Sequence, residues 1–201
     1  MVAGITVGVL LPGTRRPGGR PGAGIVAGVP LSTPQTGAAA ELGGFIQRYI
    51  AAWNGFDADA IAQLITEDVI WADPALPDPA RGVAAVQEFM RTSARAFPDL
   101  RFSGSEPAVL AVSGDLVLWG WRMEGTHQGV IDPPGFAPTG RSMRVEGVDR
   151  WIMREGRICD YRAFYDMNEV ARQLGIAPAP GSRAERAAVS LQRLQARFAW
   201  R

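Results

Sequence analysis

The stretch RSMRVEGVDRWIMREGRICDYRAFY, residues 141–165, contains two alternating patterns joined by a turn. Between residues 143 and 153 the odd positions are mostly apolar, whereas the even positions carry most of the charges. Successive side chains of a strand point to opposite faces of a sheet, so the alternation predicts strands over 141–153 and 157–165. Glu155-Gly156-Arg157 between them is typical of a hairpin turn. One face of this hairpin is expected to cover an apolar interior.

The sequence before this hairpin has helical periodicity first and strand periodicity afterwards. Apolar spacing predicts helices over 41–54 and 83–97, with a short helix between them that Asp57 caps and Leu64 ends. Further strands are expected at 69–71, 100–106, 108–113 and 116–126, and a last helix from Asp166 to Gly175. Helices followed by an antiparallel meander predict an α+β fold, in which helices pack over one face of a curved antiparallel sheet and leave an apolar pocket.

The composition excludes several kinds of chemistry. All 21 basic residues are Arg, so Schiff-base catalysis and a phosphate-binding P-loop lysine are ruled out. A single His and a single Cys cannot form a multi-His metal site or an internal disulfide. Apolar runs stay below the roughly 18 residues of a membrane-spanning helix. We expect a soluble, cytoplasmic protein with no bound metal.

Charge divides the chain into three parts. Residues 1–39 are rich in Gly, Pro and Arg with a net charge of +3, residues 40–176 carry −6, and residues 177–201 carry +4. The first part is expected to be a flexible leader and the second the folded domain.

The third part is predicted to be a linker followed by a basic amphipathic helix. Ser182 and Glu185 form a capping box. One face of the helix carries Ala187, Leu191, Leu194 and Phe198, and the other Arg186, Arg193 and Arg197. We expect it to dock on a dimer or across the acidic domain, with membrane-surface binding as the less favoured alternative. Nucleic-acid binding is disfavoured because the acidic domain repels phosphate.

The candidate polar residues of the pocket come from neighbouring strands. Asp149 is the one carboxylate on the apolar face of 143–153, where lost hydration would raise its pKa toward that of a general acid or base. A structural ion pair with a neighbouring Arg is the alternative role. His127 follows strand 116–126 at the start of a Pro- and Gly-rich loop, and Arg122 lies on that strand.

The motifs resemble those of a known family. Gly156 through Asp166, ending in Arg172-Gln173-Leu174-Gly175, looks like the closing motif of the SnoaL-like polyketide cyclases, in the nuclear transport factor 2-like superfamily. Gly125-Thr126-His127-Gln128-Gly129 is similar to the middle motif of that family, and Glu67-Asp68-Val69-Ile70-Trp71 to its opening. Trp71-Ala72-Asp73-Pro74 also resembles the limonene-epoxide hydrolases.

The resemblance implies a cone-shaped α+β barrel, a homodimer and chemistry without a cofactor. It places the last-strand catalytic aspartate of the cyclases on Ala163, and the partner position that is often His on Asp149. In the epoxide hydrolases the water-holding pair would be Trp71 and Asp73. The usual catalytic acid is therefore replaced by a methyl group.

Three functions follow from these residues. The first is a cofactor-independent tailoring enzyme of secondary metabolism that cyclises, or transfers a proton on, a polyketide-like or aromatic small molecule. In it Asp149 is the acid–base group, and His127 and Arg122 polarise a carbonyl. The second is an epoxide-opening hydrolase or cyclase that uses Asp73 and Asp149 with help from Arg122, and the third is a non-catalytic binding or partner domain. The residues expected to contact the apolar substrate are Tyr49, Trp53, Trp71, Trp121, Met123, Trp151, Tyr161 and Ala163.

Overall fold

A computed structural model describes residues 36–199 except residues 107 and 109. Most of the leader expected over 1–39 lies outside the described residues. Its last four residues, 36–39, belong to the first helix.

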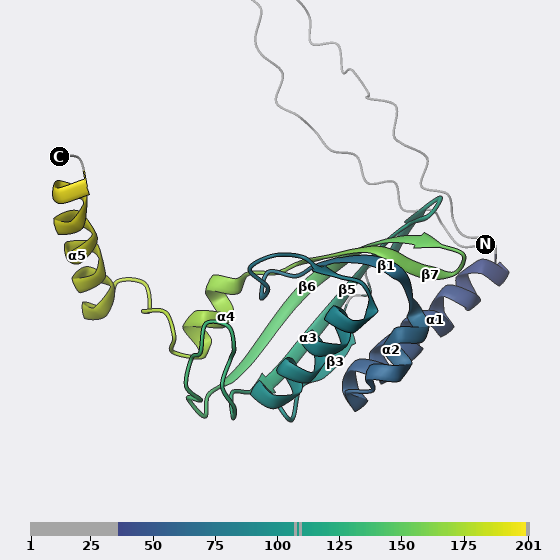
Figure 1. Ribbon diagram of the computed structural model, residues 1–201, viewed down its shortest axis with the longest axis horizontal. Helices are drawn as coiled ribbons and strands as arrows, with labels where there is room; N and C mark the ends of the chain where they lie inside the picture. Colours follow the sequence, from purple (N-terminus) through teal and green to yellow (C-terminus); the bar gives the residue numbers. More distant parts are fainter. Residues whose placement is uncertain (1–35, 107, 109, 200–201) are drawn as a thin grey trace, which may run out of the picture.

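Three helices lie on one side of the sheet (Figure 1). They are α1 (Thr36–Gly55), α2 (Ala58–Leu64) and α3 (Val83–Ala96), close to the predicted helices. Asp57 caps α2 as predicted, because its Oδ1 accepts hydrogen bonds from the N–H groups of Asp59 and Ala60. Apolar faces of these helices cover the concave side of the sheet, which creates the interior that holds the site.

The sheet has seven strands in the order β2-β1-β7-β6-β5-β3, with β4 also paired to β5. The strands are β1 (Ile65–Ala72), β2 (Ala80–Arg81), β3 (Arg101–Gly104), β4 (Leu110–Ser113), β5 (Leu116–Thr126), β6 (Ser142–Arg154) and β7 (Arg157–Phe164). All of them pair antiparallel except β1 and β7, which are parallel.

The first strand differs from the sequence prediction in length and direction. It starts at Ile65, directly after α2, and not at Val69. Two parallel strands need a long connection between them. Here β2, α3 and β3–β6 form the connection between β1 and β7. Alternation within a strand does not report the direction of its partner, which is why the sequence predicted only an antiparallel sheet.

The hairpin of β6 and β7 sets the register of the site. Glu155 and Gly156 both have positive φ, 52° and 72°, as a tight two-residue turn between twisted strands requires. The resulting ladder places Asp149 opposite Ala163 and Trp151 opposite Tyr161.

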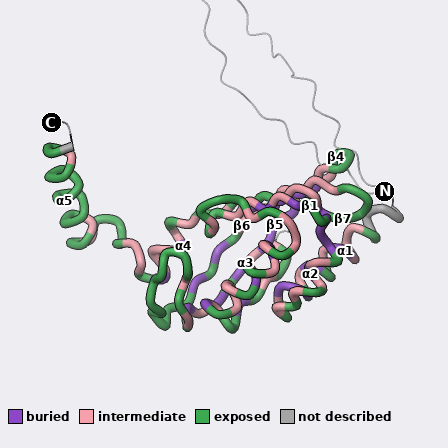
Figure 2. The backbone as a smooth tube through the Cα atoms, in the orientation of Figure 1, coloured by how far each residue is buried: buried purple, intermediate pink, exposed green. Residues whose placement is uncertain are grey.

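An aromatic cluster forms the core between the sheet and α1. Its members are Tyr49, Trp53, Trp71, Trp119, Trp151 and Tyr161, all at most 4% exposed. The rings of Trp71 and Tyr161, which pair across β1 and β7, stack with centroids 3.6 Å apart. Figure 2 shows that buried residues of the core lie along β5 and β6. Burial of each ring contributes roughly 2–3 kcal/mol to folding.

Two helices follow the sheet. Asp166 caps α4 (Met167–Gln173) as predicted, accepting from the N–H of Glu169. The capping box precedes α5 (Arg183–Ala199), where the N–H of Glu185 donates to Ser182 Oγ. Figure 1 shows α5 standing apart from the sheet, so it does not dock across its own domain.

Candidate functional site

An apolar cavity of about 200 Å³ opens between α3, α4 and the concave face of the sheet. Since a water molecule takes about 30 Å³ of liquid volume, this space is large enough for a small organic molecule. The polar side chains of its wall include Asp73, Ser93, Tyr161 and Tyr165. The other lining residues are apolar: Trp53, Ala75, Phe89, Phe97, Leu100, Phe102, Trp121, Met123, Ile131, Pro133, Pro134, Phe136, Met143, Met167, Val170, Ala171, Leu174 and Ile176.

Asp73 brings a carboxylate to the cavity wall. It lies just after β1, and its Oδ1 accepts hydrogen bonds from Tyr165 Oη at 2.7 Å and from the N–H of Ala75 at 2.8 Å. Burial raises the pKa of Asp73, and the two hydrogen bonds partly oppose that shift. Both bonds end on Oδ1, so the lone pairs of Oδ2 remain for a ligand.

Asp149 is 1% exposed, and its carboxylate stands behind two side chains of the wall. Its Oδ1 accepts hydrogen bonds from Trp121 Nε1 at 2.7 Å and from Tyr161 Oη at 3.0 Å. Burial raises the pKa of Asp149 to about 7, although the Trp121 and Tyr161 bonds lower it; the charge of Asp73 adds to the increase. The predicted buried acid is therefore present, and it reaches the cavity through Tyr161.

Tyr161 connects the two layers of the site. Its ring lines the cavity and its hydroxyl contacts Asp149. Burial, and then the charge of Asp149, raise the pKa of Tyr161 well above its ordinary value. The hydroxyl thus stays protonated and is a permanent hydrogen-bond donor.

Half of the expected substrate contacts lie on the wall and half behind it. Trp53, Trp121, Met123 and Tyr161 line the cavity. Four others are buried in the core behind it and not on the wall: Tyr49, Trp71, Trp151 and Ala163. A sequence pattern identifies the inward face of a strand, but the depth of each side chain depends on the layers packed over it.

Arg122 is not part of the cavity. It lies on the outer face of the sheet, where its Nη2 is 2.8 Å from Glu146 Oε1. Its neighbours Trp121 and Met123 point inward, so alternation along β5 turns Arg122 to solvent. The role predicted for Arg122 beside Asp149 does not fit this placement. The epoxide-opening alternative also required Arg122 in the site, and the structure does not place it there.

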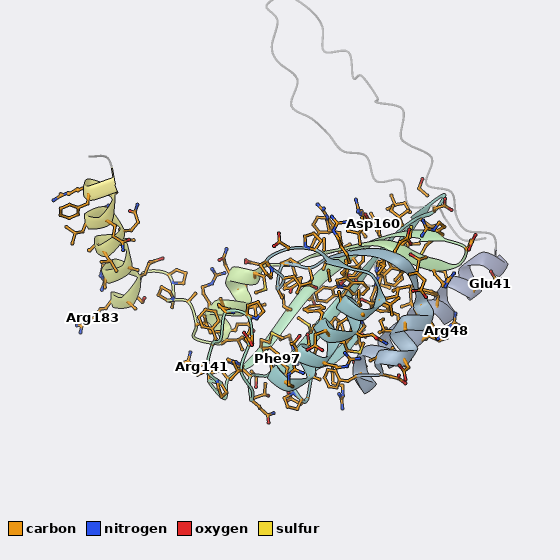
Figure 3. The ribbon with its side chains drawn as sticks, viewed as in Figure 1. Glu41, Arg48, Phe97, Arg141, Asp160 and Arg183 are labelled. Carbon is orange, nitrogen blue, oxygen red and sulfur yellow. The ribbon has the colours of Figure 1, made fainter. Side chains whose placement is uncertain are left out.

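His127 is fully buried but does not line the cavity. Its ring stacks on Phe97, and its Nδ1 accepts a hydrogen bond from the N–H of Thr139 at 3.3 Å. Its backbone also bonds to Gly140 and Arg141. His127 therefore holds the two ends of the 128–140 loop together, and that loop contributes Ile131 and Phe136 to the wall. Figure 3 shows Phe97 and Arg141 at this end of the molecule.

Sequence reasoning missed Tyr165 as a site residue. Tyr165 is in phase with Tyr161 and follows β7, so strand alternation alone could have included it. The contribution of α4, through Met167 and Val170, had no comparable signal because it depends on how α4 closes the end of the sheet. Within the described residues, no three His, Cys, Asp or Glu side chains gather as metal ligands would.

Comparison with known proteins agrees with this geometry. A family profile described as SnoaL-like polyketide cyclase matches residues 45–174. The chain belongs to the SnoaL-like polyketide cyclase family.

Solved structures share the fold of this SnoaL-like protein. TsrD from Streptomyces laurentii is 22% identical, with a TM-score of 0.59 over 69% of this chain and 97% of its own. A SnoaL-like protein from Jannaschia sp. CCS1 is 19% identical, with a TM-score of 0.62 over 73% and 100%. IdmH from Streptomyces antibioticus is 25% identical, with a TM-score of 0.55 over 66% and 97%.

Proposed function

We propose that this SnoaL-like protein catalyses a cofactor-independent ring closure of a polyketide-like small molecule, with Asp73 as the base. The observation that supports the proposal is the carboxylate of Asp73 on a mostly apolar wall, with one oxygen fixed by Tyr165 and Ala75. A raised carboxylate pKa brings the group closer to the value that general-base catalysis needs near neutral pH.

The reaction balances without an added oxidant or reductant. Ionised Asp73 removes a proton from a carbon next to a substrate carbonyl, which forms an enolate. The enolate carbon attacks a second carbonyl of the same molecule and forms a carbon–carbon bond. The resulting alkoxide then takes up a proton from Asp73, so the product is an isomer of the substrate.

Asp149 and Tyr161 stabilise the enolate in this scheme. With a pKa of about 7, Asp149 is mostly protonated at slightly acidic pH and can then donate to Tyr161 Oη. This frees the Tyr161 proton to point at the enolate oxygen on the cavity side. Two carboxyls with different environments thus take different roles, because the charge of Asp73 itself favours a neutral Asp149.

The catalytic proposal departs from the sequence-based hypothesis in the choice of base. Asp149 was expected to face the substrate, whereas Asp73 is the carboxylate on the wall. Asp149 acts as a positioning residue through Tyr161. The homodimer implied by the family resemblance is retained as part of this proposal.

The test compares wild type, Asp73→Asn and Asp78→Asn on poly-β-ketone intermediates in ¹⁸O-labelled water. Asp78 lies in the same loop, is exposed and does not line this cavity, which makes it a matched control. We expect Asp73→Asn to lose at least about a hundredfold in turnover, the lower range for a general base. Asp78→Asn should retain wild-type turnover, and the product should carry no label beyond the carbonyl exchange of a sample without enzyme.

Two results would contradict the proposal. Tight binding of these intermediates by wild type without turnover would indicate a binding domain. Incorporation of ¹⁸O beyond the carbonyl exchange of a sample without enzyme would indicate hydrolysis in place of carbon–carbon closure.

A further inference from the structure

The C-terminal helix α5 carries an apolar stripe that the proposed function does not use. Leu191, Leu194 and Phe198 are 56%, 50% and 70% exposed, and their spacing places them on one face of the helix together with Ala187. Figure 1 shows the helix apart from the sheet. A contiguous exposed stripe of large apolar side chains marks an interaction surface.

The polar side of α5 has almost only positive charge. Arg183, Arg186, Arg193 and Arg197 face a single acid, Glu185, for a net charge of +3 on the helix. At 3.6 residues per turn the four arginines fall within an arc of about 80° that adjoins the apolar stripe. The carboxylate of Glu185 is engaged at the start of the helix, where its Oε2 accepts the N–H of Gly181 at 2.6 Å.

We propose that α5 binds an anionic lipid surface, lying in the plane of the interface. Leu191, Leu194 and Phe198 would enter the boundary between headgroups and acyl chains, while the arginines contact lipid phosphates. A narrow apolar stripe, an Arg-rich flank and low overall hydrophobicity together are typical of such helices. Within residues 36–199, the helices are too short or too polar to cross a bilayer, which fits a surface-bound mode.

Pairing of α5 with a second copy is less consistent with its charges. The helix has 17 residues, less than the three to four heptads that sustain a coiled coil. Two-stranded pairs gain specificity from opposite charges beside the seam, but two copies of α5 would bring +3 next to +3. An anionic bilayer supplies both an apolar phase and the opposite charge.

The segment that connects α5 to the domain starts at the cavity. Ile176 lines the cavity, and residues 177–182 connect it to α5. The loop that carries the half-exposed Val130 and Phe136 lines the same cavity as α4, through Ile131 and Phe136. Lipid binding through α5 therefore brings the cavity end of the domain close to the bilayer.

The test measures binding of the full chain to vesicles by co-sedimentation. Vesicles of phosphatidylcholine are compared with vesicles that contain about 30 mol % phosphatidylglycerol. We expect at least about tenfold stronger binding to the anionic vesicles, with most of the difference lost in about 0.5 M NaCl.

Variants of α5 separate its two faces. Leu191→Ser/Leu194→Ser should weaken binding to anionic vesicles about tenfold or more, because the helix loses most of its buried apolar area. Val189→Ser is the matched control, since Val189 is 43% exposed but lies on the opposite side of the helix. Arg193→Gln and Arg197→Gln should each weaken binding about fivefold. Arg157→Gln, at the exposed first residue of β7, should leave it unchanged.

Binding that is equal for neutral and anionic vesicles, or absent, would overturn the proposal. Light scattering of the same variants tests the competing partner. If Leu191→Ser/Leu194→Ser converts a dimer to a monomer and no vesicle binding is found, α5 pairs copies of the chain. An unchanged melting temperature in these variants shows that the domain stays folded.

Discussion

Asp149 on β6 and Ala163 on β7 are direct neighbours across the antiparallel ladder. Residues paired in this way have Cβ atoms about 4.5–5.5 Å apart and share one face of the sheet. The position that the family resemblance assigns to a catalytic aspartate is thus a methyl group, and the adjacent position on the next strand is a buried carboxyl. A carboxyl is thus present in this part of the core, on β6 and not on β7.

The pKa of Asp149 makes folding stability depend on pH. Its pKa is about 7 in the folded protein against an ordinary value of 3.8, so folding favours the protonated form. The penalty for ionised Asp149 is absent below pH 3.8, grows between pH 4 and 7, and reaches about 4 kcal/mol above pH 7.

Asp149→Asn should therefore be more stable than wild type at pH 8, and close to it at pH 4. The measurement is the free energy of unfolding in urea at several pH values. A difference between variant and wild type that does not change with pH would show that Asp149 has an ordinary pKa.

Trp121→Phe should raise the pKa of Asp149 further. It removes the Nε1 donor 2.7 Å from Oδ1, and a hydrogen bond to a charged group contributes about 1.5–3 kcal/mol, or one to two pH units. Carboxyl ¹³C chemical shifts followed by NMR titration report the change. Trp119→Phe is the control, because Trp119 is buried on the same strand and its Nε1 has no hydrogen-bond partner within the described structure. An equal pKa of Asp149 in the two variants would show that the Trp121 hydrogen bond does not lower it.

Ala163→Asp should create a pair of carboxyls that cannot both ionise. The new group would face Asp149 across the ladder, and a like charge at this distance raises the pKa of one of the two. Relative to the isosteric Ala163→Asn, we expect Ala163→Asp to lose about 2 kcal/mol or more of stability at pH 8, with the gap closing toward pH 4. The measurement is thermal unfolding of both variants at the two pH values. A stability difference between the variants that is the same at pH 8 and pH 4 would mean that the two carboxyls do not interact.

Gly147→Ala should displace the Trp121 indole, which donates a hydrogen bond to Asp149. A Cβ at Gly147 would lie 2.4 Å from Trp121 Cζ2 and 2.9 Å from the carbonyl oxygen of Phe164, so the indole has to move. Overpacking of this kind costs about 3 kcal/mol. The measurement is the free energy of unfolding by chemical denaturation. The control is Gly104→Ala, because a Cβ at Gly104 meets no atom within 4 Å. Comparable midpoints for the two variants would show that the indole has room to adapt.

Much of the fold was predictable from local patterns. The α+β class, the capping residues Asp57 and Asp166 and the hairpin turn at Glu155-Gly156 follow from periodicity and turn chemistry. Alternation along 143–153 also identified Asp149 as the inward-facing carboxylate, because the face of a strand is a property of the strand itself.

The composition of the site was decided by tertiary packing. Whether Asp73 or Asp149 reaches the cavity wall depends on the layers placed over each by Trp121, Tyr161 and α4. His127 was expected near the substrate, yet it holds the ends of a loop. The parallel pairing of β1 with β7 joins residues about ninety positions apart, and no local signal carries that information. The sequence by itself determined which residues face inward, and only the three-dimensional packing decided which of them meet.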